Sequence, residues 1–291
     1  MTMAMIGRTF ERRGLLLVPT DPTNPNPEWF NSLSVERKME IMAGGLAIRL
    51  LEEGLLYVMP IFWLGVDEQA GAKLTNGTAF LVDCGQGVFA VTAAHVYTAY
   101  CEAKHSSREL ACQIGDMLFD PKAHLIDCDD RDGGSDIATF WLSPEDVVKI
   151  NKPVLRSDSR EWPPRPADIG DFAFFAGYPG VSRGMSPGGH YFAAVPYRAV
   201  TPITMINHRQ ITCRFDRDQM LDLSGQGLPP IGHHIGGVSG GPLLIPTLEA
   251  RGIRWRVGGV IVQAAPGDLF EQVVAVRADY ILPDGRLQGA L

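Results

Sequence analysis

The stretch that decides the fold is HHIGGVSGGPLL, residues 233–244, where one serine, Ser239, lies among four glycines. Glycine has no Cβ, so such a run lets the backbone turn tightly and lets other groups approach its N–H donors. The stretch is therefore either an ordinary turn or a backbone shaped around a nucleophile. The second interpretation requires a base, and an acid that orients this base, elsewhere in the chain.

Residues 237–241 match G-x-S-x-G, the nucleophile turn of the α/β-hydrolases. That fold requires a histidine after the serine, but all seven histidines of the chain precede Ser239. It also requires strands that alternate with helices, a pattern that the chain lacks. We therefore reject this interpretation.

The order histidine, aspartate, serine remains. His95 follows the apolar segment VTAA, and Asp136 precedes the apolar segment IATFWL. A serine hydroxyl needs a base to become a nucleophile, which makes His95 the candidate base and Asp136 the residue that orients its ring. Ser239 is then the candidate nucleophile, and the backbone N–H groups of Gly237 and Ser239 are the candidate oxyanion hole.

The pattern of the whole chain favours β structure. From residue 55 onward, short runs of β-forming residues alternate with turn residues, and no long helical pattern interrupts them, which is typical of an all-β barrel or sandwich. Residues 34–54 show an approximate helical stripe. Ser143, followed by a proline, predicts a helix start at 143–150. The proline-rich stretch 151–168 is the best candidate for a linker between two halves.

Six segments in chain order carry a resemblance to a known family: NGTAFLV, TAAHV, DIATFWL, FAGYPG, GVSGGPLL and WRVGGVIV. Together they resemble the trypsin-like (chymotrypsin-fold) serine peptidases, in particular the bacterial intracellular members, over roughly residues 55–285. The resemblance implies an all-β, chymotrypsin-like double β-barrel with an N-terminal helical extension. The implied domains are an N-terminal extension with one helix (1–54), a first β-barrel with His95 and Asp136 (55–150), an inter-barrel linker (151–168) and a second β-barrel with Ser239 (169–291).

The same resemblance implies a serine endopeptidase that cuts protein or peptide substrates through an acyl-enzyme on Ser239, without a cofactor or a metal ion. Val238 stands where trypsin and its digestive relatives have an aspartate that pairs with a new amino terminus, so activation by zymogen cleavage is not expected. Val262 stands where a serine commonly bonds the aspartate of the triad. These two departures leave open a catalytically weak or silent binding or signalling module of the same fold. An esterase is a third, narrower alternative.

The resemblance also locates a substrate pocket. His233 and His234 fall near its base, and Gln263 and Ala264 fall on its wall. Cleavage after Lys or Arg needs an acidic residue at the base, and none lies there. A pocket lined by these two histidines would accept an acidic side chain of the substrate, or a neutral one when the histidines are uncharged. The alternative is that both histidines are ordinary loop residues without a role in binding. Adjacent residues on a strand point to opposite faces, which argues against a metal site.

Composition argues against several partners. The net charge is −7 and no basic run is present, so we expect no nucleic-acid partner. The longest apolar stretch, 54–66, is too short to span a membrane, and the apolar run near the first residue is too short for a signal peptide. The five cysteines form no C-x-x-C pair, so we expect reduced thiols and a cytoplasmic protein. Control by a regulatory protein partner or a signal is expected, with the N-terminal extension as the segment that docks.

Overall fold

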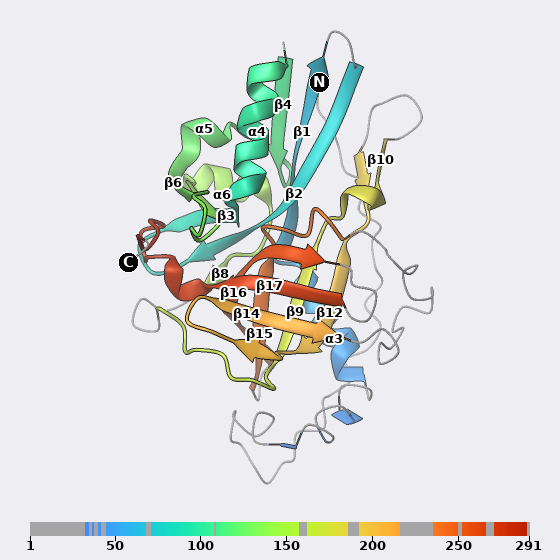
Figure 1. Ribbon diagram of the computed structural model, residues 1–291, viewed down its shortest axis with the longest axis vertical. Coiled ribbons are helices and arrows are strands. Elements are labelled where there is room, and N and C mark those ends of the chain that lie inside the picture. The colour runs from blue at the N-terminus through green and yellow to red at the C-terminus, as the bar shows by residue number, and fades with distance from the viewer. Residues whose placement is uncertain are drawn as a thin grey trace.

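β-strands are the main regular structure of the described chain, and nearly all of them pair in the antiparallel direction (Figure 1). The computed structural model describes residues 33–34, 37, 40–41, 45–67, 71–107, 109–156, 162–185, 192–215, 235–249, 252–265 and 271–289. Two sheets account for nearly all the strands, and they correspond to the first and the second half of the chain.

The first sheet has the strand order β5-β4-β1-β2-β3-β7-β6, and β8 pairs with β2 in parallel. The long hairpin of β1 and β2 lies in the middle of this sheet. β8 falls within 151–168, so this predicted linker contributes a short strand to the first sheet. The strands are β1 (Val58–Asp67), β2 (Gly71–Asp83), β3 (Val88–Ala93), β4 (Glu109–Ile114), β5 (Met117–Leu118), β6 (Leu125–Asp129), β7 (Ile137–Trp141) and β8 (Leu155–Arg156).

The second sheet has the order β12-β9-β15-β16-β17-β14-β13. It curls on itself, because β12 near one end contacts β14 near the other. A separate hairpin pairs β10 (Arg183–Met185) with β11 (Phe192–Ala194). The strands of the second sheet are β9 (Phe172–Gly177), β12 (Tyr197–Pro202), β13 (Met205–Ile206), β14 (Gln210–Phe215), β15 (Pro242–Glu249), β16 (Gly252–Ala265) and β17 (Glu271–Arg277).

This architecture confirms the predicted all-β class and is compatible with a double β-barrel of the chymotrypsin-like kind. One apolar cluster joins the two sheets, with Phe80 and Val91 from the first and Phe174 and Val260 from the second. Each sheet also has a cluster of its own on its other face. The shared cluster holds the sheets together, so residues on their facing ends keep a fixed relative position.

The last helix of the N-terminal extension packs on the second sheet. This helix, α3 (Ala47–Leu55), contacts β9 and β12, and its Leu50 is fully buried in the shared cluster. Gly54, the last residue of the predicted helical stretch 34–54, lies one residue before the end of α3. An added Cβ at Gly54 would lie 2.7 Å from the Phe174 ring, so the glycine permits close packing as well. At the start of the predicted helical stretch, Ser34 Oγ accepts a hydrogen bond from Arg37 N at 3.3 Å, as an N-cap does. Residues 35–36 and 38–39 lie outside the described residues.

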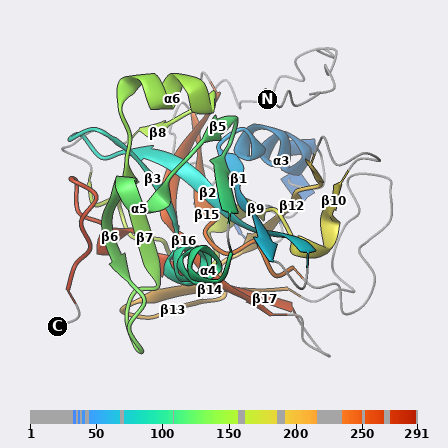
Figure 2. The same cartoon turned by 90° about the horizontal axis from the view of Figure 1, so that it is seen from above.

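Helix α4 (Ala94–Ser106) was not expected from the sequence. It follows β3 directly and contacts β1, β3, β4 and β7, and Figure 2 views it along its axis. Its buried residues are Ala94, Val96 and Tyr100, a sparse pattern that does not stand out against the β-forming residues around it. α5 (Pro121–His124) and α6 (Pro144–Ile150) are shorter.

The predicted helix start at Ser143 is confirmed. The Ser143 hydroxyl accepts a hydrogen bond from Asp146 N at 3.2 Å, and the Asp146 carboxylate accepts one from Ser143 N at 3.1 Å. We expect Ser143→Ala to lower the free energy of unfolding by about 1 kcal/mol, because the amide of Asp146 loses its acceptor. Urea denaturation measures this change. Ser143→Thr keeps a hydroxyl cap and should stay within about 0.5 kcal/mol of wild type; an equal loss in both variants would contradict the capping role.

The C-terminal residues return to the first sheet, although they belong to the predicted second barrel. Thr139 Oγ1 donates to Gly285 O at 2.6 Å, and Leu287 N donates to the Asp127 carboxylate at 3.0 Å. The two halves are thus tied together beyond their shared cluster. Within the described ranges, no helix is both long and apolar enough to cross a membrane.

All five cysteines are free thiols. Burial raises the pKa of Cys112, Cys128 and Cys213 to about 12. Thiols with such pKa values hold almost no thiolate at neutral pH and are poor nucleophiles. These three cysteines therefore do not compete with a serine for a nucleophilic role.

Candidate active site

His95 and Asp136 meet at the start of α4. β3 ends at Ala93 and α4 begins at Ala94, which makes His95 the second residue of the helix. The first N–H groups of a helix have no acceptor within it. Here Asp136 supplies both acceptors: Ala94 N donates to its backbone O at 3.0 Å, and His95 N donates to its Oδ1 at 2.9 Å. The aspartate therefore caps the helix that carries the histidine.

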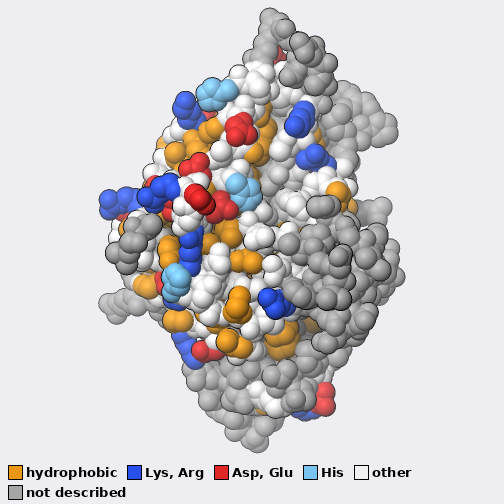
Figure 3. Space-filling model, viewed as in Figure 1, with side chains coloured by type: hydrophobic (Ala, Val, Ile, Leu, Met, Phe, Trp, Pro, Cys, Tyr) orange, Lys and Arg blue, Asp and Glu red, His pale blue; other side chains and the backbone are white. Residues whose placement is uncertain are grey.

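The two side chains also bond directly. His95 Nδ1 lies 2.8 Å from Asp136 Oδ2. An ionised carboxylate only accepts hydrogen bonds, so Nδ1 carries the proton and Nε2 of the neutral ring keeps a free lone pair. The side chain of His95 is 50% exposed and that of Asp136 is 32% exposed, so this pair opens to solvent. Figure 3 shows acidic side chains gathered beside a histidine on the face viewed in Figure 1.

The loop before Asp136 is held by a buried carboxylate. Asp129 accepts hydrogen bonds from Arg131 Nε and from Ser135 N, each at 2.7 Å, and its backbone O accepts from Asp136 N at 2.8 Å. Burial alone would raise the pKa of Asp129, but the hydrogen bonds from Arg131 and Ser135 hold it below its usual range. Asp136 itself takes a left-handed conformation, with φ at +51°, which aspartate tolerates better than most residues. These contacts set the direction of its carboxylate.

Three of the four glycines around Ser239, namely Gly237, Gly240 and Gly241, are required by conformation or by space. Gly237 and Gly240 have φ values of +104° and +88°, where residues with a Cβ are strained. An added Cβ at Gly240 would lie 2.1 Å from Thr78 O, and one at Gly241 would lie 2.3 Å from Ala176 O. The stretch is therefore a tightly packed turn, and we call residues 236–241 the serine turn.

The serine turn packs against the strand that leads to the histidine. An added Cβ at Gly240 would also lie 2.9 Å from Ala93 N, two residues before His95. Ser239 O accepts a hydrogen bond from Thr78 N at 3.0 Å, and Thr78 O accepts one from Thr92 Oγ1 at 2.6 Å. The fold thus brings the serine turn of the second sheet to the end of β3. Among the described residues, the Ser239 hydroxyl makes no hydrogen bond, so it is not bonded to His95 in this conformation.

Among the described residues, three of the backbone N–H groups of the serine turn have an acceptor and three have none. Val238 N donates to Ile235 O at 3.2 Å, Gly240 N to Ile261 O at 2.7 Å and Gly241 N to Val238 O at 3.0 Å. Gly236 N, Gly237 N and Ser239 N, in contrast, have no acceptor in the described part of the chain. Gly237 N and Ser239 N are the two N–H groups predicted from the sequence as oxyanion donors, and donors without a partner beside a nucleophile are what an oxyanion hole needs.

Val238 is packed among apolar residues. This side chain is fully buried in the cluster of the second sheet, next to residues such as Ile235 and Leu243. Val262 lies at an irregularity in the pairing of β16 with β17, and it has no group that could bond Asp136. The carboxylate of Asp136 takes its two hydrogen bonds from the backbone and the ring of His95 instead.

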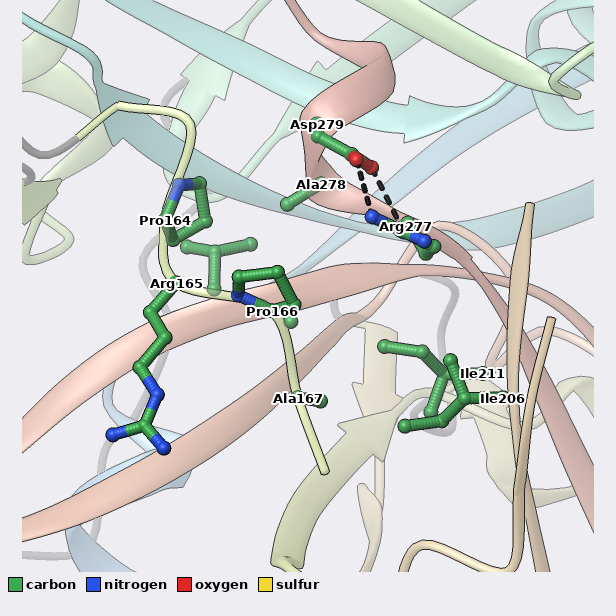
Figure 4. Close-up of a pocket in the computed structure, with 11 residues that line it drawn as sticks. Pro164, Arg165, Pro166, Ala167, Ile206, Ile211, Arg277, Ala278 and Asp279 are labelled. Carbon is green, nitrogen blue, oxygen red and sulfur yellow. Dashed lines mark hydrogen bonds and ion pairs between the residues drawn. The ribbon is translucent and has the colours of Figure 1, made fainter. Parts of the chain in front are cut away.

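The predicted substrate pocket is seen only in part. Gln263 is exposed and Ala264 is half-buried on β16. His233 and His234 lie outside the described residues, so the base of the pocket stays a prediction. A different, shallow pocket lies between the proline-rich segment 164–167 and the strands of the second sheet, beside an ion pair of Arg277 with Asp279 at 2.6 Å (Figure 4). None of the predicted site residues lines this second pocket.

Sequence reasoning missed Thr78 and Asp129. Thr78 belongs to NGTAFLV, a segment noted only as part of the family resemblance, and Asp129 is the last residue of β6, beside an acidic loop. The feature of the sequence that could have identified Thr78 is a polar residue directly before the apolar run AFLV of β2. Among the described residues, no three His, Cys, Asp or Glu side chains gather as a metal site.

Comparisons with known proteins do not identify the chain. It matches no protein-family model, and a comparison with curated proteins finds no match. A structure solved in work on the coupled folding and binding of the intrinsically disordered Sesbania mosaic virus VPg protein is similar, at 13% identity and a TM-score of 0.39. The match covers 76% of this chain and 85% of that chain. Function therefore has to be inferred from the residues of the site.

Proposed function

We propose that this protein is a serine hydrolase that cuts peptide bonds with Ser239 as nucleophile, His95 as base and Asp136 as orienting acid. One observation carries the proposal. Asp136 Oδ2 accepts a hydrogen bond from His95 Nδ1, and the two atoms are 2.8 Å apart. This pair lies next to the end of β3, the strand against which the serine turn packs. A surface histidine in an ordinary turn has no need of a carboxylate that accepts from both its backbone and its ring.

The proposed reaction balances without a cofactor. As Ser239 Oγ bonds the substrate carbonyl carbon, its proton moves to Nε2 of His95 and the carbonyl oxygen becomes an oxyanion. The N–H groups of Gly237 and Ser239 donate hydrogen bonds to that oxyanion. The C–N bond then breaks, and the proton on Nε2 passes to the leaving amine. Water attacks the acyl-enzyme with His95 again as base, which releases the acid and restores Ser239.

The finer parts of the proposal rest on the sequence. The chain order of His95, Asp136 and Ser239, with the six resembling segments, supports a trypsin-like serine peptidase of the bacterial intracellular type. The five cysteines without a C-x-x-C pair support a location in the cytoplasm. Val238 supports control by a partner or a signal in place of zymogen cleavage, because valine cannot pair with a new amino terminus. Substrate selection by His233, His234, Gln263 and Ala264 belongs to the same proposal.

Labelling with a fluorophosphonate tests the reaction. This probe reacts with a serine whose base and oxyanion donors are assembled, so we expect labelling of wild type and none of Ser239→Ala. Ser106→Ala is a matched control, since the Ser106 hydroxyl donates only to carbonyls of its own helix, Glu102 O and Ala103 O. It should label like wild type.

The outcome also separates the alternatives. Folded wild type that takes no label would contradict the hydrolase and favour the silent binding module. If wild type takes the label, a fresh unlabelled sample is then given an unfolded protein substrate and a p-nitrophenyl ester. Cleavage of both fits a peptidase, whereas cleavage of the ester alone would identify an esterase.

A further inference from the structure

Thr78 on β2 connects the first sheet to the serine turn through its hydroxyl and its backbone N–H. The residue is fully buried. Its Oγ1 donates to Gly237 O at 2.6 Å and accepts from Tyr178 N at 3.0 Å. Its backbone N donates to Ser239 O at 3.0 Å, and its backbone O accepts from Thr92 Oγ1 at 2.6 Å. A threonine is therefore fully satisfied here, and two of its bonds go to carbonyls of the serine turn.

Every carbonyl from Gly236 to Ser239 is held by a donor. Gly236 O accepts from Gly180 N at 2.8 Å, and Val238 O accepts from Gly241 N at 3.0 Å. Thr78 holds the other two, Gly237 O and Ser239 O. The C=O and N–H of a trans peptide unit point in opposite directions, so a held carbonyl also sets the direction of the N–H that follows it. The free N–H groups of Gly237 and Ser239 belong to the peptide units of Gly236 O and Val238 O, and they point away from the donors that hold those carbonyls.

The Thr78 hydroxyl also supports the donor that holds Gly236 O. It accepts from Tyr178 N, and Tyr178 O accepts from Asn76 Nδ2 at 2.5 Å. These two bonds fasten the segment that continues to Gly180, whose N–H holds Gly236 O. The hydroxyl thus acts on the serine turn directly at Gly237 and indirectly through Gly180.

Hydrogen bonds to the carbonyls restrict the rotation of peptide units in a glycine-rich turn. Gly236 and Gly237 have no Cβ, so their shared peptide unit rotates more easily than one between other residues. A rotated unit would place a carbonyl where the oxyanion donor should be. The buried Val238 cannot prevent this rotation by an ion pair, because it carries no charge.

We infer that Thr78 is a positioning residue that keeps the oxyanion hole formed in the resting protein, without cleavage or a partner. This inference rests on the proposed function and adds how its site is regulated. The serine turn is assembled by a hydroxyl from the other sheet. Control by a partner then acts on access of the substrate to the site, and not on assembly of the oxyanion hole.

The test compares Thr78→Val, which keeps the shape but loses the hydroxyl, with Thr78→Ser, which keeps the hydroxyl. The readout is the rate of Ser239 acylation by a p-nitrophenyl ester and by its thionoester, in which sulfur replaces the carbonyl oxygen and is bound weakly by oxyanion donors. We expect Thr78→Val to slow the ester reaction about 10²- to 10³-fold, as for loss of one donor, while the thionoester rate changes little. Thr78→Ser should restore the ester rate to within about threefold of wild type.

Thr201→Val is the matched control, because Thr201 is a buried threonine of the second sheet whose hydroxyl has no partner among the described residues. It should leave the ratio of ester to thionoester rates unchanged. An unchanged ratio in Thr78→Val, or an equal fall of both rates with a lowered melting temperature, would overturn the inference.

Amide hydrogen exchange at Val238 decides the inference even when wild type is inert toward esters. The Val238 N–H belongs to the peptide unit whose carbonyl Thr78 holds. Thr78→Val should therefore speed its exchange at least about tenfold relative to wild type, and Thr78→Ser should not. Equal exchange in wild type and Thr78→Val would overturn the inference, whereas inert wild type alone would overturn only the proposed function.

Discussion

Replacing Asp136 by asparagine is expected to lower the rate of Ser239 acylation about 10⁴-fold. The carboxylate now accepts from His95 Nδ1 at 2.8 Å, which keeps the lone pair of the ring on Nε2. An amide can present its NH₂ group to Nδ1, and the ring then keeps its proton on Nε2 and cannot serve as the base. The pseudo-first-order rate with a fluorophosphonate or an activated ester measures the change.

The fold should survive this substitution. Asparagine tolerates the left-handed conformation of residue 136, and its amide oxygen can still accept from His95 N. Asp132→Asn is the matched control, because it removes an equal charge from an exposed position of the same loop. A comparable loss in both variants would indicate a general electrostatic effect. A loss of less than tenfold in Asp136→Asn would remove Asp136 from the proposed triad.

Gly240→Ala should destabilise the protein by about 3 to 5 kcal/mol, from backbone strain and overpacking together. Its φ is +88°, and the new Cβ would lie 2.1 Å from Thr78 O and 2.2 Å from Thr92 Oγ1. Thr78 O is a backbone atom and cannot move aside for the new Cβ as the end of a flexible side chain can. The serine turn therefore has to move away from β3. Guanidinium denaturation at 25 °C measures the free energy, and acylation of Ser239 should fall in parallel.

Gly236→Ala provides the contrast within the same turn. No heavy atom lies within 4 Å of a Cβ added there, and Gly236 is exposed. The free energy of unfolding should change by less than about 1 kcal/mol. If Gly240→Ala were as stable as Gly236→Ala, the serine turn would not pack against the end of β3 as described.

Features that depend on neighbouring residues were predictable from the sequence. The cap of α6 follows from a serine three residues before an acid, and both hydrogen bonds are present. Gly237 and Gly240 have positive φ values, which strongly favour glycine, as expected for a turn shaped by its glycines. The apolar runs beside His95 and Asp136 placed both residues at strand ends.

Features that depend on distant residues were not predictable. α4 has few buried residues, and its first N–H groups are satisfied by Asp136, which lies 41 residues beyond His95. Thr78 holds Gly237 O across 159 residues. The return of the C-terminal residues to the first sheet depends on a bond between Thr139 and Gly285, 146 residues apart. The two partners of each bond are too far apart in the sequence for a local pattern to predict their contact.

The sequence by itself determined the all-β class, the order of the three candidate catalytic residues and the need for glycine around Ser239. These properties depend on residue type and local backbone conformation, which each residue and its neighbours in the sequence determine. Only the tertiary structure decided that the Asp136 carboxylate bonds both the backbone and the ring of His95, and that Thr78 holds the serine turn. The physical reason is that hydrogen bonds depend on distance and direction to within a few tenths of an ångström, and packing of the two sheets sets both.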